Sequence, residues 1–541
     1  MKKNNLVKQI SGKIICGFFA LVMPIAAFGQ GQTIVYGENG VTLKTDPYGW
    51  STESLFPDSS RSYNSVTAND TMIQGFVLGG VAPDSVEQNR VFINNCIIGE
   101  SVIGGFSKNS GAIENSVTMN GGRIRGDVSG GTSEGGTAIG NSVTINPGSI
   151  NKDTVRGVVY GGYSEQNHAT HNTVTINGGI IRVVYGGLAN YIGDAVYNSV
   201  TVNDGTILMG IYGGYSDLGG ASHNTVSING GTVNADILGG MGSSGGDAKY
   251  NTVSISGNPT FEATAGIYGG DFGNDNFTGN KLELKTAGIS VNVVQNFEFI
   301  NFYLPSTIAD GDTVITLAMA TDLSNVTIGL DFASTDPSLA MGDVITLISS
   351  VTNRPDNDST VFNIEQYAFL ISVDGGALIA TVIGVIPVYT VSFAGNVSIA
   401  PQRVFTGNLV IKPANPVRSG YSFEGWYTDN NTFANAWNFA TDKVTQDTTL
   451  YAKWNPEVGI VEANGIRPNI KVYPNPTNGE LRIENGEFSS IENGEIYDVL
   501  GRRQKAESRK GENTVIIDIS HLASGVYYLK IDNKTVKVIK N

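Results

Sequence analysis

Cysteine is almost absent from this sequence, whose 541 residues include only two cysteines, Cys16 and Cys96. Because Cys16 lies in an apolar N-terminal run, a processed chain would keep Cys96 alone and could form no internal disulfide. Its stability must therefore come from packing and backbone pairing. Positive charge is also scarce, with 34 Lys and Arg against 49 Asp and Glu. The net charge of −15 argues against nucleic acid as a partner, since phosphate binding requires a basic face.

Long apolar runs are absent beyond the N-terminus, so we expect no transmembrane span in the mature chain. The first 29 residues have the pattern of a secretory signal peptide. Four lysines, Lys2, Lys3, Lys8 and Lys13, precede an apolar run from Ile14 to Phe28, which is too short to span a bilayer comfortably. A small-residue stretch ending at Gly29 suits cleavage before Gln30. The remainder, about 510 residues, is long enough for several domains.

Helix-forming stretches are scarce, whereas glycine is abundant at 69 residues. Together with many Val, Ile, Thr and Tyr residues, this composition indicates an all-β protein. A motif of the type Asn-Ser-Val-Thr-Ile-Asn recurs with a period of about 26 residues. One unit of such a repeat cannot bury its apolar side alone, but stacked copies can, with coils about 4.8 Å apart. The repeat therefore predicts a parallel β-solenoid (β-helix) over residues 30–288. Its copies, two of them degenerate, begin at Asn64, Asn89, Asn115, Asn141, Asn172, Asn198, Asn224, Asn251 and Asn280.

Alternation along the motif predicts which side chains face the core. The central valine column, from Val66 to Val253, should point inward, as should the apolar column from Met119 to Ile255. The leading asparagines share this parity, so we expect them to form an amide ladder that satisfies polar groups from coil to coil. The Gly-Gly pair of most repeats predicts corners with either a positive φ or a close approach of another backbone.

Two further columns of the repeat could carry function. Ser65 and Thr67 begin a hydroxyl-rich face that resembles the Thr-x-Thr ranks of ice-binding proteins, although threonine is also simply a good strand residue. Near the Gly-Gly pairs, a tyrosine column could stack on sugars or anchor a protein partner. Alternatively, these rings stack on one another and stabilise the coils. The candidate surface-contact residues are Tyr160, Tyr163, Tyr185, Tyr212, Tyr215 and Tyr268.

Catalysis has little support in the sequence. A solenoid that hydrolyses polysaccharides needs two carboxylates in a defined geometry, and a lyase needs a clustered acidic metal site and a base. Only Glu134 and Glu165 occupy equivalent positions in successive repeats, and a variable polar loop explains them better. His168 and His171 have a spacing that could suit a metal, but no third or fourth ligand accompanies them. We therefore expect no catalytic residue, no metal and no cofactor.

The 26-residue period fades between residues 289 and 386, although the β pattern persists. This change predicts irregular terminal coils or a β cap that closes the open edge of the solenoid. Residues 387–454 follow as a compact aromatic module. Its segments Pro416-Val-Arg-Ser-Gly-Tyr-Ser-Phe-Glu-Gly-Trp426 and Asp447-Thr-Thr-Leu-Tyr-Ala-Lys-Trp454 resemble the Listeria–Bacteroides repeat of bacterial surface proteins. The resemblance implies a small β-grasp-like domain that acts as a spacer or contact module.

Residues 455–470 have the composition of a polar linker, and residues 471–541 form a separate segment. Three of its pieces resemble the C-terminal sorting domain of the type IX (Por) secretion system: Val472-Tyr-Pro-Asn-Pro-Thr-Asn-Gly479, Ile496-Tyr-Asp-Val-Leu-Gly-Arg502 and Leu522-Ala-Ser-Gly-Val-Tyr-Tyr-Leu-Lys530. Alternating strands joined by Pro-Asn-Pro and Asn-Gly turns predict a small β-sandwich. The sorting-motif residues are Pro474, Asn475, Pro476, Gly479, Gly501 and Gly525.

This resemblance implies Sec export, transfer across the outer membrane by the type IX secretion machinery, and display on the cell surface. In that family the tail is usually removed and the protein is attached to lipopolysaccharide. The sequence as a whole then favours a non-catalytic adhesin or structural surface protein, with surface glycans or host proteins as possible partners. The alternative is a surface carbohydrate-active enzyme or carbohydrate-binding protein. An ice-binding solenoid is the minor alternative.

Overall fold

The structure is a computed structural model of the chain. It describes residues 33–36, 43, 53–57, 62–148, 154–271, 274–334, 336–456, 470–485, 494–510, 514–531 and 534–541. Strands occur throughout these ranges and helices do not, so the ranges hold no helix that could cross a membrane. The chain divides into two compact units, Met1–Val388 and Tyr389–Asn541. The predicted signal peptide and most of the predicted linker lie outside the described residues.

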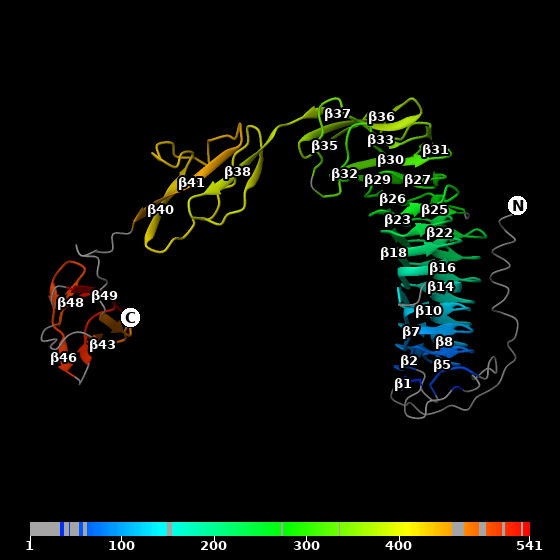
Figure 1. Cartoon of the computed structure of the whole chain (residues 1–541), viewed down its shortest axis with the longest axis horizontal. Helices are drawn as coiled ribbons and strands as arrows, with labels where there is room; N and C mark the ends of the chain where they lie inside the picture. Colours follow the sequence, from blue (N-terminus) through cyan, green and yellow to red (C-terminus); the bar gives the residue numbers. More distant parts are fainter. Residues whose placement is uncertain are drawn as a thin grey trace. The chain divides into compact units, whose positions relative to one another are not determined.

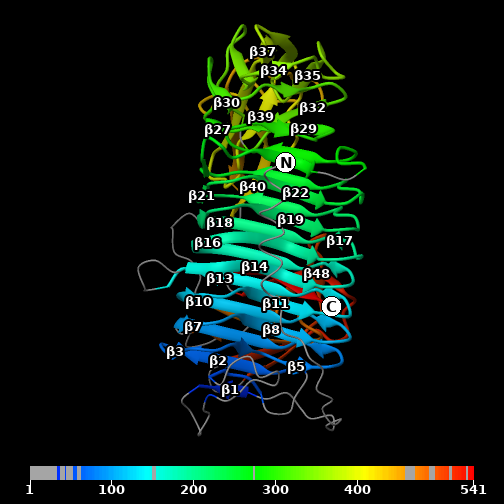
Figure 2. The same cartoon turned by 90° about the vertical axis from the view of Figure 1, so that its right-hand side faces the viewer.

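The first unit is a parallel β-solenoid, as the repeat predicts, in which each copy of the Asn motif supplies one rung of a long sheet. Equivalent residues of neighbouring rungs are in register, as with Val117, which pairs with Val91 on one side and Val143 on the other. Figures 1 and 2 show these rungs stacked one above another. In stacking order they are β1 (Thr33–Val35), β2 (Ser65–Asn69), β7 (Arg90–Ile98), β10 (Ser116–Ile124), β13 (Ser142–Asn146), β16 (Thr173–Ala189), β18 (Ser199–Ile207), β20 (Thr225–Ile228), β23 (Thr252–Ile255), β26 (Lys281–Leu284), β29 (Phe299–Leu304) and β32 (Thr327–Phe332).

The Gly-Gly motifs form a second parallel stack, and short strands just before five of the asparagines form a third. The second stack contains β4 (Val77–Leu78), β8 (Val102–Ser107), β11 (Val128–Ser133), β14 (Thr154–Ser164), the end of β16, β19 (Ile211–Ser216), β22 (Ile237–Gly242), β25 (Ile267–Asp271) and β28 (Val294–Gln295). The third contains β6 (Val86–Glu87), β9 (Ala112–Ile113), β12 (Ala138–Ile139), β15 (Ala169–Thr170) and β17 (Ala195–Val196). A fourth parallel stack includes β3 (Met72–Ile73), the ends of β7, β10 and β18, the start of β14, β21 (Thr232–Val233) and β24 (Thr260–Phe261).

The core of the solenoid is one continuous apolar column. The central valines and the apolar residues two positions later are buried, as the alternation predicts. The glycines lie within strands of the second stack, and close approach excludes their side chains. A Cβ on Gly161 would lie 2.3 Å from the carbonyl oxygen of Gly186 in the next coil. A Cβ on Gly162 would lie 2.3 Å from the amide carbon of Asn172.

The solenoid ends in a sheet that changes from parallel to antiparallel pairing. Strands β27 (Ile289–Val291), β30 (Thr313–Leu317) and β33 (Val344–Ile348) still stack in parallel. Strand β37 (Ala377–Val385) then pairs with β33 in the opposite direction, and β36 (Tyr367–Asp374) and β35 (Val361–Ile364) continue the antiparallel order. Such a meander ends the parallel stacking, and its apolar residues continue the solenoid core as far as Val382.

The second unit holds two small β modules, which we describe separately. The aromatic module is a four-stranded sheet in the order β39 (Gln402–Phe405), β38 (Val388–Ala394), β41 (Thr448–Pro456) and β40 (Tyr421–Tyr427). Trp426 is buried in its core against Phe393, with ring centroids 5.0 Å apart. Dense aromatic packing of this kind stabilises a domain that is too small to build a large aliphatic core.

The sorting module is a sandwich of two antiparallel four-stranded sheets, which confirms the predicted fold. One sheet has the order β42 (Ile470–Tyr473), β43 (Glu480–Asn485), β47 (Thr514–Asp518) and β46 (Glu507–Lys510). The other has the order β45 (Arg503–Gln504), β44 (Gly494–Asp498), β48 (Gly525–Ile531) and β49 (Lys534–Lys540). Leu481 and Ile517 from the first sheet pack with Leu529 from the second in one buried cluster.

Candidate contact surfaces and the sorting motif

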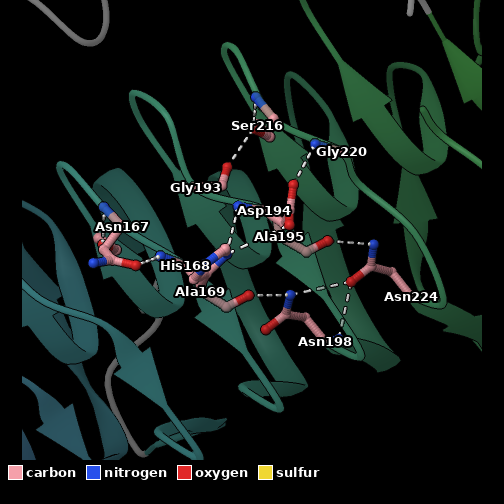
Figure 3. Close-up of polar contacts among 12 residues, drawn as sticks. Asn167, His168, Ala169, Gly193, Asp194, Ala195, Asn198, Ser216, Gly220 and Asn224 are labelled. Atoms are coloured by element: carbon pink, nitrogen blue, oxygen red, sulfur yellow. Dashed lines mark hydrogen bonds and ion pairs between the residues drawn. The ribbon is translucent and has the colours of Figure 1, made fainter. Parts of the chain in front are cut away.

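The leading asparagines form the predicted amide ladder along one edge of the solenoid. Asn198 donates from Nδ2 to the carbonyl oxygen of Ala169 (2.9 Å) and to Oδ1 of Asn224 (3.1 Å). Oδ1 of Asn224 also accepts the backbone N–H of Asn198 (2.9 Å), as Figure 3 shows. Similar bonds recur in most coils, and the asparagines from Asn64 to Asn280 are all buried. This ladder satisfies backbone as well as side-chain groups.

The histidine pair predicted as a weak metal candidate does not converge. Nδ1 of His168 accepts the backbone N–H of Asp194 (2.9 Å), and Oδ1 of Asp194 accepts the N–H of Gly220 (2.7 Å) (Figure 3). His171 stacks instead on Tyr197, with centroids 5.1 Å apart. Among the residues the structure describes, no cluster of three or more His, Cys, Asp or Glu side chains could hold a metal ion.

The tyrosine column lies in a second apolar cluster on the face of the Gly-Gly strands. Tyr160 stacks on Tyr185 with centroids 5.7 Å apart, and Tyr185 stacks on Tyr212 at 4.6 Å. Tyr160, Tyr163, Tyr185 and Tyr215 are buried, whereas Tyr212 and Tyr268 are half-buried. Burial raises the pKa of Tyr212 to about 12, and it also raises the pKa of Tyr185. The rings therefore stack on each other, and the half-buried ones offer a limited surface.

The carboxylate pair lies at the edge of this cluster. Glu165 accepts hydrogen bonds from the Tyr163 hydroxyl and from Nδ2 of Asn190 (3.0 Å). Burial raises the pKa of Glu134, Lys108 lowers it, and the neighbouring charge of Glu165 raises it further. Both oxygens of Glu165 thus have protein partners.

An exposed row of aromatic side chains lies at the corner just before four successive ladder asparagines, Asn172, Asn198, Asn224 and Asn251. We call His171, Tyr197, His223 and Tyr250 the corner strip. Their rings follow one another from coil to coil at centroid distances of 5.1, 4.8 and 5.0 Å. All four have a left-handed backbone, with φ between 57 and 59°. Tyr197 is 52% exposed and Tyr250 is 48% exposed.

The sequence prediction of this column was incomplete. The spacing of His168 and His171 suggested only a possible metal pair, and the stacking of the rings in this column was missed. The signal was the glycine found at the same position in two coils, Gly140 and Gly279, because a column that accepts glycine can require a positive φ. Both glycines have a positive φ, at 66 and 68°.

The sorting motif fastens the last strand of its module. Asn475 donates from Nδ2 to the carbonyl oxygen of Lys537 (2.7 Å), and its Oδ1 accepts the N–H of Ile539 (2.8 Å). Thr477 is buried, and its backbone N–H donates to the carbonyl oxygen of Ile539 (2.8 Å). Gly479 packs against Ser520, where a Cβ would lie 2.9 Å from the serine Cβ. The Pro-Asn-Pro-Thr-Asn-Gly turn therefore ties the C-terminal strand β49 to the sandwich.

Comparisons with known families match both modules of the second unit. Residues 389–453 match the Listeria–Bacteroides repeat domain, and residues 471–541 match the secretion system C-terminal sorting domain. The two resemblances found in the sequence are thereby confirmed. The sorting domain makes this a protein that the type IX system secretes and attaches to the cell surface.

Three curated relatives share a short segment with the chain. A putative membrane protein of Evansella cellulosilytica is 40% identical over 84 residues, which is 15% of this chain and 12% of that protein. A putative Gly-rich membrane protein of the same organism is 42% identical over 81 residues, 14% of this chain and 9% of that protein. Internalin H of Listeria monocytogenes is 39% identical over 67 residues, 12% of each chain. The chain thus spans about a tenth of the length of these relatives.

Proposed function

We propose that this secreted surface protein is a non-catalytic adhesin and that the corner strip is its contact surface. The observation that carries the proposal is the combination of exposure and backbone strain in that strip. A non-glycine residue in a left-handed conformation costs about 1 kcal/mol or more, and such strain concentrates at functional positions. The fold accepts glycine in this column, at Gly140 and Gly279, yet four successive described repeats place an aromatic ring there.

The strip suits a partner that is recognised by aromatic edges and polar tips. Tyrosine supplies a large rigid surface and a hydroxyl, which is why it is enriched in binding surfaces. Because the rings cover each other's faces, the exposed parts are their edges and polar atoms. A glycan or a protein surface with both apolar and hydrogen-bonding groups fits this chemistry.

The test replaces Tyr197 and Tyr250 with asparagine, which tolerates a positive φ and removes the rings. The matched control is Tyr63→Asn, because Tyr63 has a φ of 63° and is 61% exposed in the same column, whereas Gln88 occupies the next coil. Binding of each purified mature protein to arrays of glycans and extracellular-matrix proteins is then measured. We expect the double variant to lose binding and the control to keep it. Equal binding by all three proteins would refute the corner strip as the contact surface.

A carbohydrate-active enzyme is the second candidate, and the raised pKa of Glu134 beside Glu165 favours it. Glycoside hydrolysis uses a pair of carboxyl groups, one of which acts as a general acid with a raised pKa. Screening the mature protein against polysaccharides tests this candidate. Turnover that disappears in both Glu134→Gln and Glu165→Gln would replace the adhesin proposal with an enzyme.

A further inference from the structure

The sorting module displays two apolar side chains at the tip of a tightly bonded turn. The turn joins β44 to β45 and contains Val499, Leu500 and Gly501, whose φ of 76° suits glycine. Oδ1 of Asp498 accepts the backbone N–H groups of Leu500 and Arg502, both at 2.9 Å. Its Oδ2 accepts Nε of Arg502 (2.8 Å). These bonds, led by the Arg502 N–H, lower the pKa of Asp498, so the turn keeps its ionised anchor at neutral pH.

The tip carries the two most exposed large apolar side chains among the described residues of the module. Val499 is 65% exposed and Leu500 is 73% exposed, whereas the sandwich core around Leu481 is fully buried. An apolar pair with no role in the core is free to bury its surface against a partner. A preformed turn also loses little conformational freedom on binding, which favours affinity.

The surroundings of the tip indicate the charge of that partner. The side chains of Arg502 and Arg503 are 71 and 68% exposed. Arg502 is anchored by Asp498, and Arg503 pairs with Glu495 at 3.0 Å. Two held cations beside an apolar pair complement a pocket that is apolar at its base and acidic at its rim. The carboxylates that pair with them are less exposed, at 13% for Asp498 and 31% for Glu495, so the guanidinium groups are the more accessible charges at the tip.

We propose that Val499 and Leu500 are the docking element through which the sorting module enters an apolar, acid-rimmed pocket on a protein of the secretion machinery. The proposal rests on the sorting function of residues 471–541 and names the surface that performs it. Val499 and Leu500 supply the buried contact, and Arg502 and Arg503 supply orientation. Asp498 acts as a positioning residue, because it shapes the turn without facing the partner.

The experiment uses the full-length chain in a host that has a type IX secretion system, and it measures the fraction of protein that external protease can reach. The tip variant carries Val499→Asn and Leu500→Asn. The matched control is Val417→Asn, because Val417 is an apolar side chain of the other module and is 95% exposed. A truncated variant lacks residues 471–541, and a conservative variant carries Val499→Ile and Leu500→Met.

We expect the tip variant to lose surface display by about tenfold or more, since burial of two such side chains contributes at least that factor to binding. The control and the conservative variant should be displayed normally, and the purified tip variant should melt at the same temperature as the parent. Normal display of the tip variant while the truncated chain is trapped would overturn the docking element but keep the sorting function. Normal display of the truncated chain would overturn both. A lowered melting temperature of the tip variant would assign the pair to the fold and overturn the proposal.

A photo-crosslinking residue at position 500 identifies the molecule that contacts the tip. Crosslinking to an identified protein of the secretion machinery during export supports the proposal. Crosslinking to a second copy of this chain, or to lipopolysaccharide alone, contradicts it.

Discussion

Replacing Asn172 with alanine removes one rung of the buried amide ladder and leaves its neighbours in place. Oδ1 of Asn172 accepts two hydrogen bonds from Asn141, one from the backbone N–H (2.9 Å) and one from Nδ2 (3.0 Å). Nδ2 of Asn172 donates to the carbonyl oxygen of Ala138 (2.9 Å) and to Oδ1 of Asn198 (3.0 Å). The substitution therefore breaks four hydrogen bonds in a place that water does not reach.

The magnitude follows from the groups left without partners. Two donors of Asn141, the backbone N–H and one amide hydrogen, lose their acceptor in the core edge. An unsatisfied buried donor costs about 1–3 kcal/mol, so with two such donors we expect the solenoid to lose about 2–6 kcal/mol of local stability. The acceptors are less affected, because Oδ1 of Asn198 keeps the backbone N–H of residue 172 as a donor (3.0 Å).

A second, more exposed asparagine ladder supplies the matched control. Nδ2 of Asn177 donates to Oδ1 of Asn146 (2.7 Å), and Asn203 donates to Oδ1 of Asn177 (2.7 Å). Water can replace these bonds, so Asn177→Ala should cost less than about 1 kcal/mol.

Hydrogen exchange of the purified mature proteins, followed by mass spectrometry over β13 and β16, gives the free energy of local opening in each variant. A loss in Asn172→Ala no greater than that in Asn177→Ala would refute the reasoning that the buried ladder satisfies groups that water cannot.

Three further predictions concern single side chains. Burial raises the pKa of Asp127, so the folded state favours the protonated carboxyl over the carboxylate. The protonated form therefore contributes stability at low pH, and this contribution is lost as the pH rises through the folded-state pKa. Asp127→Asn should raise the melting temperature at pH 7 and give no gain near pH 3. Hydrogen bonds, first from Thr432, lower the pKa of Asp429 to about 2, so Asp429→Asn should lower the melting temperature of the aromatic module at pH 6, with the difference disappearing as the pH falls toward 2. Asn475→Ala loses both bonds to strand β49 and should destabilise the sorting sandwich by about 1–3 kcal/mol in urea titrations, while Tyr528→Phe, which removes a hydroxyl from the same sheet, should not.

The solenoid could be predicted from the repeat because in-register stacking places equivalent residues of successive repeats in the same environment. A period near 26 residues placed the valines from Val66 to Val253 in one column, and alternation alone then assigned them to the core. The ladder asparagines were predictable for the same reason. The tyrosines were harder, since alternation distinguishes two faces of a strand but does not reveal whether the outer face is covered. Tyr160 and Tyr185 point away from the main core, yet Val158, Val183 and neighbouring rings enclose them in a second cluster.

The corner strip and the sorting tip could not be predicted because each depends on a local backbone shape. A positive φ at His171 or Tyr197 is invisible in composition, and only the glycines elsewhere in the column hint at it. In the sequence, the Asp498 turn has the pattern of an ordinary Leu-Gly turn. The exposure of Val499 and Leu500 can be explained only when the hydrogen bonds of Asp498 are known.

The corner strip lies next to the buried ladder in each of its four coils, and this proximity explains how a strained column can persist. The residue before each ladder asparagine takes the left-handed conformation, and the asparagine that follows is fixed by bonds to both neighbouring coils. Strain persists where surrounding structure over-determines the backbone, and the ladder provides that constraint at Asn198 beside Tyr197. Weakening the ladder should therefore allow the residues of the corner strip to leave the left-handed conformation. Asn198→Ala, which touches no exposed ring, should reduce binding through the corner strip together with local stability, whereas Tyr197→Asn should reduce binding alone. Equal loss of stability in both variants would mean that the rings serve the fold and would return the contact role to another surface.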